Sequence, residues 1–165
     1  KIQSYTDTAD TGTDYLCSII YGIYQKEAYI LDVIYTNDPM EVTEPLVAKH
    51  LFDYKVNEAY IESNNGGRGF SRQISHHLTD TYNTNYTVIR PFHQSKNKQS
   101  RILSNATWVM EHIYFPTNWH NKYPEFYKAI TSYQREGKNL HDDAPDALTG
   151  VAEKINTQTP IFSFD

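Results

Sequence analysis

The sequence predicts an α/β fold: a mixed central sheet whose first three strands are antiparallel, flanked by helices. The first 36 residues contain three apolar runs, separated by short segments rich in turn-forming residues, which is the pattern of consecutive β-hairpins. After residue 37 the apolar spacing changes to a helical period, and helical and short strand-like segments then alternate. With 165 residues, the chain is long enough for one domain with a core and too short for two. We therefore expect residues 1–165 to form a single domain.

The opening hairpins use residues 1–7, 15–24 and 28–36 as strands. The second run is rich in Ile, Tyr and Leu, and the third is almost entirely apolar or β-branched, as strands favour. Asp, Thr and Gly follow the first strand, and Gln25-Lys26-Glu27 supplies the second turn.

The first predicted helix covers residues 39–54, where the apolar side chains fall on one helical stripe. Asp38 and Pro39 precede this stripe, and proline favours the first turn of a helix. The further predicted strands are 58–62, 86–91 and 113–115, the further predicted helices are 69–82, 101–112, 123–134 and 145–155, and the predicted loops are 94–100 and 137–140.

Composition excludes several classes of protein. The sequence has no long apolar run, which argues against a membrane span, and its formal net charge of -5 argues against a domain that coats nucleic acid by bulk positive charge. The lone Cys17 excludes an intrachain disulfide, and the seven histidines lack the spacing of a structural zinc site. Because the chain begins at Lys1 rather than Met, we expect it to be part of a longer protein.

Three acidic clusters lie at the ends of predicted elements, within residues 5–14, 60–68 and 141–148. Asp7 and Glu62 each end a predicted strand, and Asp142, Asp143 and Asp146 surround the start of the last predicted helix. If the fold brings these carboxylates together, they repel unless divalent cations lie between them, and Mg²⁺ and Mn²⁺ prefer oxygen ligands. Two such ions form a clamp for in-line displacement at phosphorus. The clusters therefore favour a metal-dependent nuclease.

Each cluster also has a simpler interpretation. Asp, Thr and Gly are common in hairpin turns, so the residues around Asp7 could form a polar turn in which Gly12 allows tight packing. Glu62 could be a solvated acid before the Gly66-Gly67 loop. An Asp before a helix is a typical N-cap, although three carboxylates within five positions exceed the one that a cap needs.

Basic residues in and just after the second acidic cluster, and in the polar stretch 96–101, are candidates for contacts with DNA phosphates. Each could equally be a solvated surface residue. The candidates are Arg68, Arg72, Lys96, Lys98 and Arg101.

Together these motifs resemble the C-terminal nuclease domain of the large terminase subunit of tailed bacteriophages. The motifs are a strand-terminal Asp with a loop of the form Thr-Ala-x-x-Gly-x-Asp, an acid followed by Asn and Gly, a Lys-x-x-Arg-Ile element, and His-Asp-Asp-Ala-Pro-Asp-Ala-Leu. They occupy residues 7–14, 62–67, 98–102 and 141–148, so the resemblance covers nearly the whole chain, and the last motif is the most specific.

The resemblance implies a ribonuclease H-like fold and an endonuclease that cleaves concatemeric viral double-stranded DNA during genome packaging. It implies two Mg²⁺ or Mn²⁺ ions, with Asp7 and Glu62 as ligands and an Asp of the last cluster as a third. Asp143 is our first choice for that ligand and Asp146 our second.

The resemblance also implies partners. The full protein would carry an ATPase domain and work with the portal and the small terminase subunit, without a membrane, in the cytoplasm of the bacterial host. This chain lacks a Gly-x-x-x-x-Gly-Lys-Ser/Thr phosphate loop, so we expect the ATPase motor to be absent from it. Two alternatives remain open at this stage. One is another ribonuclease H-like nuclease, such as a resolvase or a transposase core, and the other is a non-catalytic docking module for DNA packaging.

Overall fold

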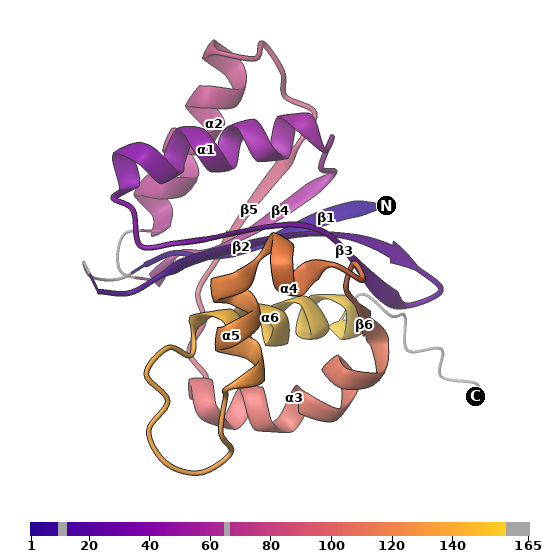
Figure 1. Ribbon diagram of the computed structural model, residues 1–165. Helices are drawn as coiled ribbons and strands as arrows, with labels where there is room; N and C mark the ends of the chain where they lie inside the picture. The colour runs from indigo at the N-terminus through magenta and orange to yellow at the C-terminus, as the bar shows by residue number, and fades with distance from the viewer. Residues whose placement is uncertain (10–12, 65–66, 158–165) are drawn as a thin grey trace, which may run out of the picture.

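The central feature of the computed structural model, which describes residues 1–9, 13–64 and 67–157, is a mixed six-stranded sheet (Figure 1). The strand order is β5-β4-β1-β2-β3-β6. The strands are β1 (Ile2–Asp7), β2 (Leu16–Tyr24), β3 (Glu27–Thr36), β4 (Glu58–Glu62), β5 (Val88–Phe92) and β6 (Ile113–Tyr114). β1, β2 and β3 pair antiparallel, whereas β4 pairs parallel with both β1 and β5, and β6 pairs parallel with β3. The predicted mixed sheet with three antiparallel opening strands is confirmed.

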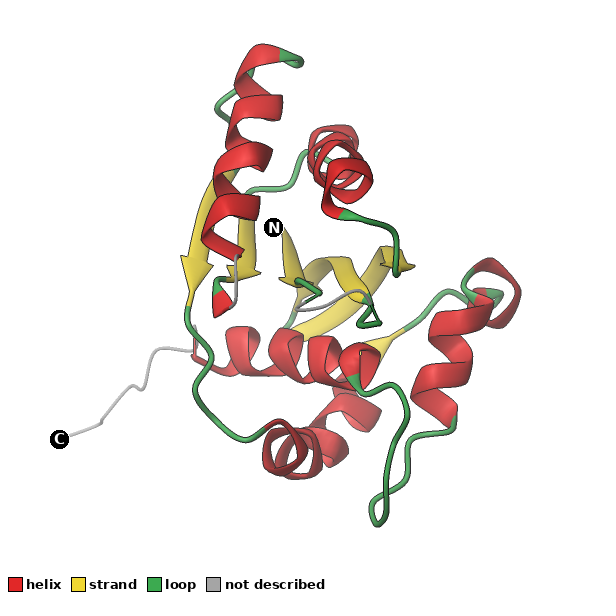
Figure 2. Ribbon diagram, turned by 90° about the vertical axis from the view of Figure 1, so that its left-hand side faces the viewer, coloured by secondary structure: helices red, strands yellow, loops and turns green. Residues whose placement is uncertain are grey.

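Helices cover both faces of the sheet (Figures 1 and 2). One face carries α1 (Met40–Asp53) and α2 (Gly67–Asp80). On the other face α6 (Asp143–Thr157) packs directly against β1 and β2, and α5 (Pro124–Thr131) lies beside it. α3 (Lys98–His112) packs against α6, and the short α4 (Trp119–Lys122) precedes α5.

Two apolar cores form because neighbouring residues of a strand point to opposite faces of the sheet. Tyr5 and Ile19 belong to the core under α5 and α6. Ile20 and Ile61 belong to the core under α1 and α2. This alternation fixes which residues at the strand ends point toward α6.

Asp32 of β3 links the two helical layers. Its carboxylate accepts hydrogen bonds from His50 Nε2 of α1 (2.8 Å) and from the hydroxyl of Tyr123, beside α5 (2.6 Å). Burial raises the pKa of Asp32, but these hydrogen bonds outweigh burial and hold the pKa well below its usual range.

Several boundaries differ from the sequence prediction. α3 begins at Lys98, inside the predicted loop, because the side chain of Asn97 accepts a hydrogen bond from the Ser100 N–H and caps the helix. α6 begins at Asp143 rather than at Pro145. The predicted helix 123–134 is only residues 124–131, and α4 was missed because a single turn stabilised by packing leaves little periodicity. Among the described residues, no helix has the length and apolar character that a membrane crossing requires.

Candidate metal centre

Asp7 and Glu62 lie side by side at the ends of two parallel strands. Thr6 pairs with Ile61 in the β1–β4 register, so the next residue of each strand reaches the same edge of the sheet. Asp7 follows Tyr5 by two positions and therefore points toward α6. Glu62 follows Ile61, which faces the opposite core, so Glu62 also points toward α6. Both acids are buried.

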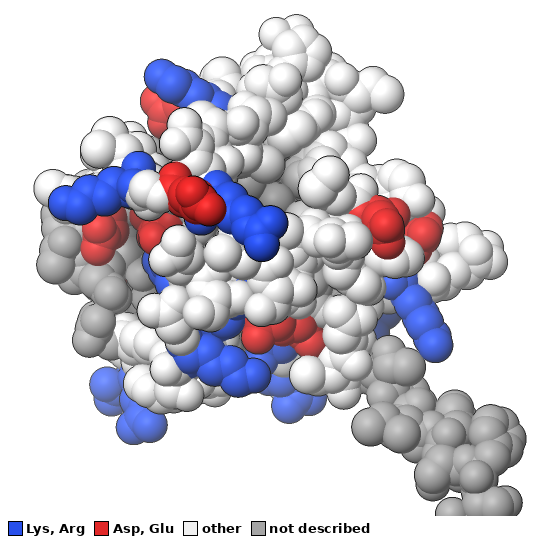
Figure 3. Space-filling model, turned by 90° about the horizontal axis from the view of Figure 1, so that it is seen from below, with Lys and Arg blue, Asp and Glu red and all other residues white. Residues whose placement is uncertain are grey.

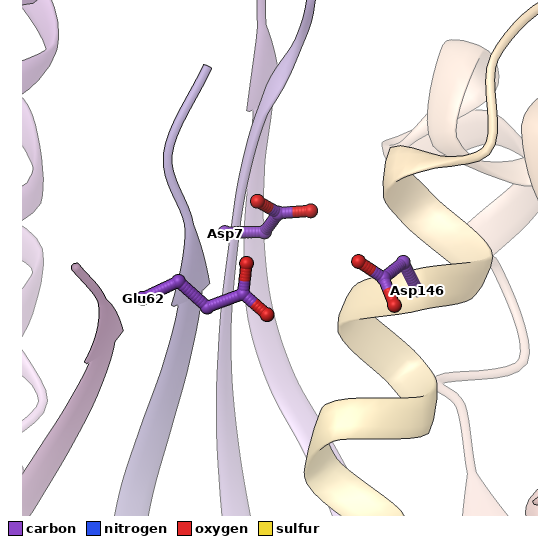
Figure 4. A group of neighbouring side chains, drawn as sticks. All are labelled: Asp7, Glu62 and Asp146. Atoms are coloured by element: carbon purple, nitrogen blue, oxygen red, sulfur yellow. The ribbon is translucent and has the colours of Figure 1, made fainter. Parts of the chain in front are cut away.

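Helix α6 adds Asp146 to this pair. Ala147, Leu148 and Val151 pack into the core against the sheet, and Gly150 faces the Tyr5 ring so closely that a Cβ there would lie 2.0 Å from Tyr5 Cζ. This close approach buries Asp146 against the strand ends. One carboxylate oxygen from each of Asp7, Glu62 and Asp146 lies within 4.8 Å of the others, and the three side chains point toward one another (Figure 4).

Two residues outside this trio hold its members in place. The Tyr5 hydroxyl donates a hydrogen bond of 2.6 Å to Glu62 Oε1. The buried Arg101 guanidinium, which is 4% exposed, donates to Asp146 Oδ1 and to Glu153 Oε1. Such contacts fix the rotamers of the carboxylates before any ligand binds.

Lys98 lies closer to the carboxylates than any other described ammonium group. Its Nζ is 3.7 Å from Asp7 Oδ2 and 3.5 Å from Asp146 Oδ2. It is also 3.0 Å from Asp143 Oδ1 and 3.3 Å from Asp142 Oδ1. One cation thus bridges four acids.

The pKa shifts in the site reflect the cost of burying several carboxylates close together. Burial and the neighbouring Glu62 raise the pKa of Asp7 well above its usual range, although Lys98 opposes them. Burial likewise raises the pKa of Asp146, against the charges of Lys98 and Arg101. Burial lowers the pKa of Lys98, but the surrounding carboxylates outweigh it and hold the pKa above its ordinary value. The site therefore favours added positive charge.

The chemistry of the trio fits a divalent cation. Its three donors are carboxylate oxygens, the ligands that Mg²⁺ and Mn²⁺ prefer. Asp7 Oδ2 is buried and accepts no hydrogen bond from the described residues, and its one described ionic neighbour is Lys98 at 3.7 Å. A cavity of about 110 Å³ lies beside the trio, and water occupies about 30 Å³ per molecule in the liquid, so the cavity has room for an ion with part of its hydration shell.

The two candidates for the third acid lie in different positions. Asp146 groups with Asp7 and Glu62, whereas Asp143 lies at the rim, where its carboxylate contacts Lys98 and accepts a hydrogen bond from the Tyr15 N–H (3.1 Å). Asp143 remains a candidate for a second cation. Gly12 and Gly66, which the sequence placed in loops beside the acids, lie outside the described residues.

The predicted DNA-contacting residues do not form one strip. Arg68 and Arg72 are exposed on α2, and Lys96 and Lys98 line the cavity beside the acids. Arg101 was expected at the surface and is instead buried in ion pairs with Asp146 and Glu153. On the face seen from below, Lys and Arg side chains are mixed with Asp and Glu side chains (Figure 3).

Sequence reasoning missed Tyr5 and Gly150, and it missed that Arg101 positions Asp146. The sequence carried a signal for Tyr5, since a residue two positions before Asp7 shares its face of the strand. The contact between Gly150 and Tyr5 left no such signal, because it depends on how α6 crosses the sheet.

Comparison with known proteins agrees with this geometry. Residues 6–113 match the family described as the ribonuclease H-like domain of the bacteriophage T7 terminase. No curated protein matches the chain significantly.

Solved structures share the fold at low sequence identity. The manganese-soaked, inhibitor-bound terminase nuclease domain of human cytomegalovirus superimposes with a TM-score of 0.63 and 15% identity, over 93% of this chain and 82% of that one. The Holliday junction resolvase of fowlpox virus superimposes with a TM-score of 0.58 and 12% identity, over 95% of this chain and 99% of that one. A complex of fowlpox virus resolvase with Holliday junction DNA gives a TM-score of 0.51 at 15% identity, over 96% and 100%. The shared fold is the ribonuclease H-like fold.

Proposed function

Because the chain belongs to the family of ribonuclease H-like domains of the bacteriophage T7 terminase, we propose that it is a metal-dependent endonuclease. Its substrate would be concatemeric viral double-stranded DNA, cleaved during genome packaging. One observation carries the proposal: buried carboxylates of Asp7, Glu62 and Asp146 converge to within 4.8 Å. Burying three acids together is costly unless cations compensate their charge.

Asp7, Glu62 and Asp146 would hold the cations, and Asp143 would complete a second position. Two bound Mg²⁺ or Mn²⁺ ions would activate a water for attack on phosphorus and stabilise the leaving 3′-oxygen. Asp7 groups with Glu62 and Asp146 and lies 3.7 Å from Lys98 Nζ, so we assign it a central role in holding the cations.

The remaining residues of the site orient the acids and the substrate. Tyr5 and Arg101 each hold one carboxylate through a hydrogen bond. Lys96 lines the same cavity and is suited to a backbone phosphate. Contacts to phosphates carry no sequence information, so cleavage should show little sequence preference. An ATPase domain, the portal and the small terminase subunit would present the DNA to this site.

The test is cleavage of plasmid DNA by the purified chain without ATP. We expect nicking with Mn²⁺ or Mg²⁺, and complete loss in EDTA. Asp7→Asn, Glu62→Gln and Asp146→Asn should each reduce cleavage by at least about 100-fold, the scale on which a catalytic electrostatic contact acts. Cleavage that persists in EDTA would contradict the proposal.

Glu58→Gln is the matched control, because Glu58 lies on the same strand as Glu62. Glu58 is at the far end of β4, where Arg90 pairs with it. This variant should cleave like the wild type. Equal losses in Glu58→Gln and Glu62→Gln would point to damage to β4 rather than to a metal ligand.

A junction-resolving nuclease is the second candidate, favoured by the similarity of the whole chain to the fowlpox virus resolvase. The two functions differ in substrate. A packaging nuclease should cut linear duplex and four-way junctions at similar rates. Paired, symmetric cuts confined to the junction would favour the resolvase.

A further inference from the structure

The Lys98 ammonium lies beside two of the three carboxylates that would hold a divalent cation, those of Asp7 and Asp146. It lies 3.0–3.7 Å from Asp7, Asp142, Asp143 and Asp146. The atom it approaches on Asp7 is Oδ2, the buried oxygen that accepts no hydrogen bond from the described residues. A metal ion that bound this oxygen would therefore compete with the ammonium for it.

We propose that Lys98 is an exchangeable counter-ion that competes with divalent cations for Asp7 and Asp146. Metal loading would then require the ammonium to leave these two carboxylates. The inference rests on the proposed function, because that function makes these acids the metal ligands.

Two basic residues share Asp146, and the structure distinguishes their roles. Arg101 contacts Oδ1 from a buried position, with a second bond to Glu153 that holds it there. Lys98 contacts Oδ2 from a side chain that is 37% exposed. Arg101 is thus a buried, doubly bonded partner of Asp146, whereas Lys98 approaches Oδ2 from a partly exposed position.

The Lys98 side chain can move from Asp7 and Asp146 toward the surface. It is the first residue of α3, whose start is fixed by the Asn97 cap, so the flexible stem can turn without moving the helix. Asp142, whose side chain is 43% exposed, lies at the outer side of the group and can retain the ammonium near the surface. Leaving Asp7 and Asp146 therefore does not strand a buried charge.

The test is titration calorimetry of the metal-free protein with MnCl₂, in the absence of DNA. Lys98→Met keeps the stem and removes the charge, and we expect it to bind Mn²⁺ about tenfold more tightly or better, because charges about 4 Å apart interact strongly. Lys96→Met is the matched control. Lys96 lines the same cavity, but no ion pair joins it to the acids among the described residues. It should change the affinity by less than about twofold, as expected for a screened charge.

Thermal unfolding in EDTA gives a readout independent of metal. Lys98→Met should unfold at a lower temperature than Lys96→Met, since four carboxylates lose their shared counter-ion. Adding Mn²⁺ should raise the unfolding temperature of Lys98→Met more than it raises that of the wild type. Lys98→Gln provides a second variant if Lys98→Met fails to show the circular dichroism of the wild type.

The outcomes separate the two hypotheses. Suppose that the wild type binds Mn²⁺ and that Lys98→Met binds it equally well or more weakly. That result would overturn the exchange and leave the proposed function standing. An equal gain in both methionine variants would also overturn it, as a general charge effect. Binding by Lys98→Met alone would support the exchange and count against the proposed function. No binding by either protein would overturn both.

Discussion

Replacing Tyr5 by Phe should weaken metal binding without disturbing the fold. The substitution removes only the hydroxyl that donates a 2.6 Å hydrogen bond to Glu62 Oε1. The ring stays against Gly150 and Phe92, so the packing under α6 is unchanged. The Glu62 carboxylate is then free to leave the orientation in which it faces Asp7.

The magnitude follows from the kind of bond that is lost. A hydrogen bond to a charged group contributes about 1.5–3 kcal/mol to stability, against about 1 kcal/mol for a neutral pair. Loss of a residue that orients a metal ligand typically lowers metal affinity by about 10- to 100-fold. We therefore expect the Kd for Mn²⁺ to rise by a factor in that range.

The assay is calorimetric titration with MnCl₂, and Tyr21→Phe is its control. Tyr21 is equally buried under α6, and its hydroxyl donates to Gln3 Oε1 at 3.1 Å, away from the acids. It should lose about 1 kcal/mol of stability, as for a neutral pair, and keep its Mn²⁺ affinity. Unchanged affinity in Tyr5→Phe, or the same loss in both variants, would refute the idea that Tyr5 orients Glu62.

Three further predictions follow from contacts outside the trio. Gly150→Ala should destabilise the protein by about 1–3 kcal/mol or more, because the new methyl would overlap the Tyr5 ring; Gly69→Ala, which meets nothing within 4 Å, should not lower the unfolding temperature. The depressed pKa of Asp32 means that its stabilising contribution is present above its unfolded pKa of about 3.9 and is lost as pH falls. The cost of Asp32→Asn in chemical denaturation should accordingly be larger at pH 6 than at pH 3, and a cost independent of pH would contradict this. Each exposed cation that contacts a phosphate should flatten the log–log salt dependence of DNA binding by about 0.9 when replaced by Ala, and an unchanged slope would mark that residue as solvated surface. The residues to test are Arg68, Arg72 and Lys96.

The fold could be predicted because the apolar residues of the sequence follow a strand-like pattern first and a helical pattern afterwards. Apolar runs in the first 36 residues and helical spacing after residue 37 indicate the strands and helices, and the short turn segments between the runs indicate that neighbouring strands pair. The position of Asp7 and Glu62 followed from the same logic, since both end strands that lie next to each other in the sheet. Predicting that Asp7 and Glu62 lie close together required only the strand ends and no knowledge of side-chain packing.

Which Asp of the last cluster groups with Asp7 and Glu62 could not be predicted, because it depends on where α6 begins. A start at Pro145 would leave Asp143 before the helix, whereas the observed start at Asp143 places Asp146 one turn in, facing the strand ends. Arg101 was misplaced for a related reason. Whether an arginine meets solvent or an acid depends on the packing of α3 against α6, which no local pattern encodes.

The central claim is that Asp7, Glu62 and Asp146 bind divalent cations. Crystals soaked in Mn²⁺, measured by anomalous diffraction, test it most directly. The account predicts a strong anomalous peak with oxygen atoms of all three carboxylates at about 2.0–2.6 Å, the usual range for such ligands, and a second peak on the Asp143 side of Asp7. Manganese bound elsewhere, with no peak between these three acids, would contradict it.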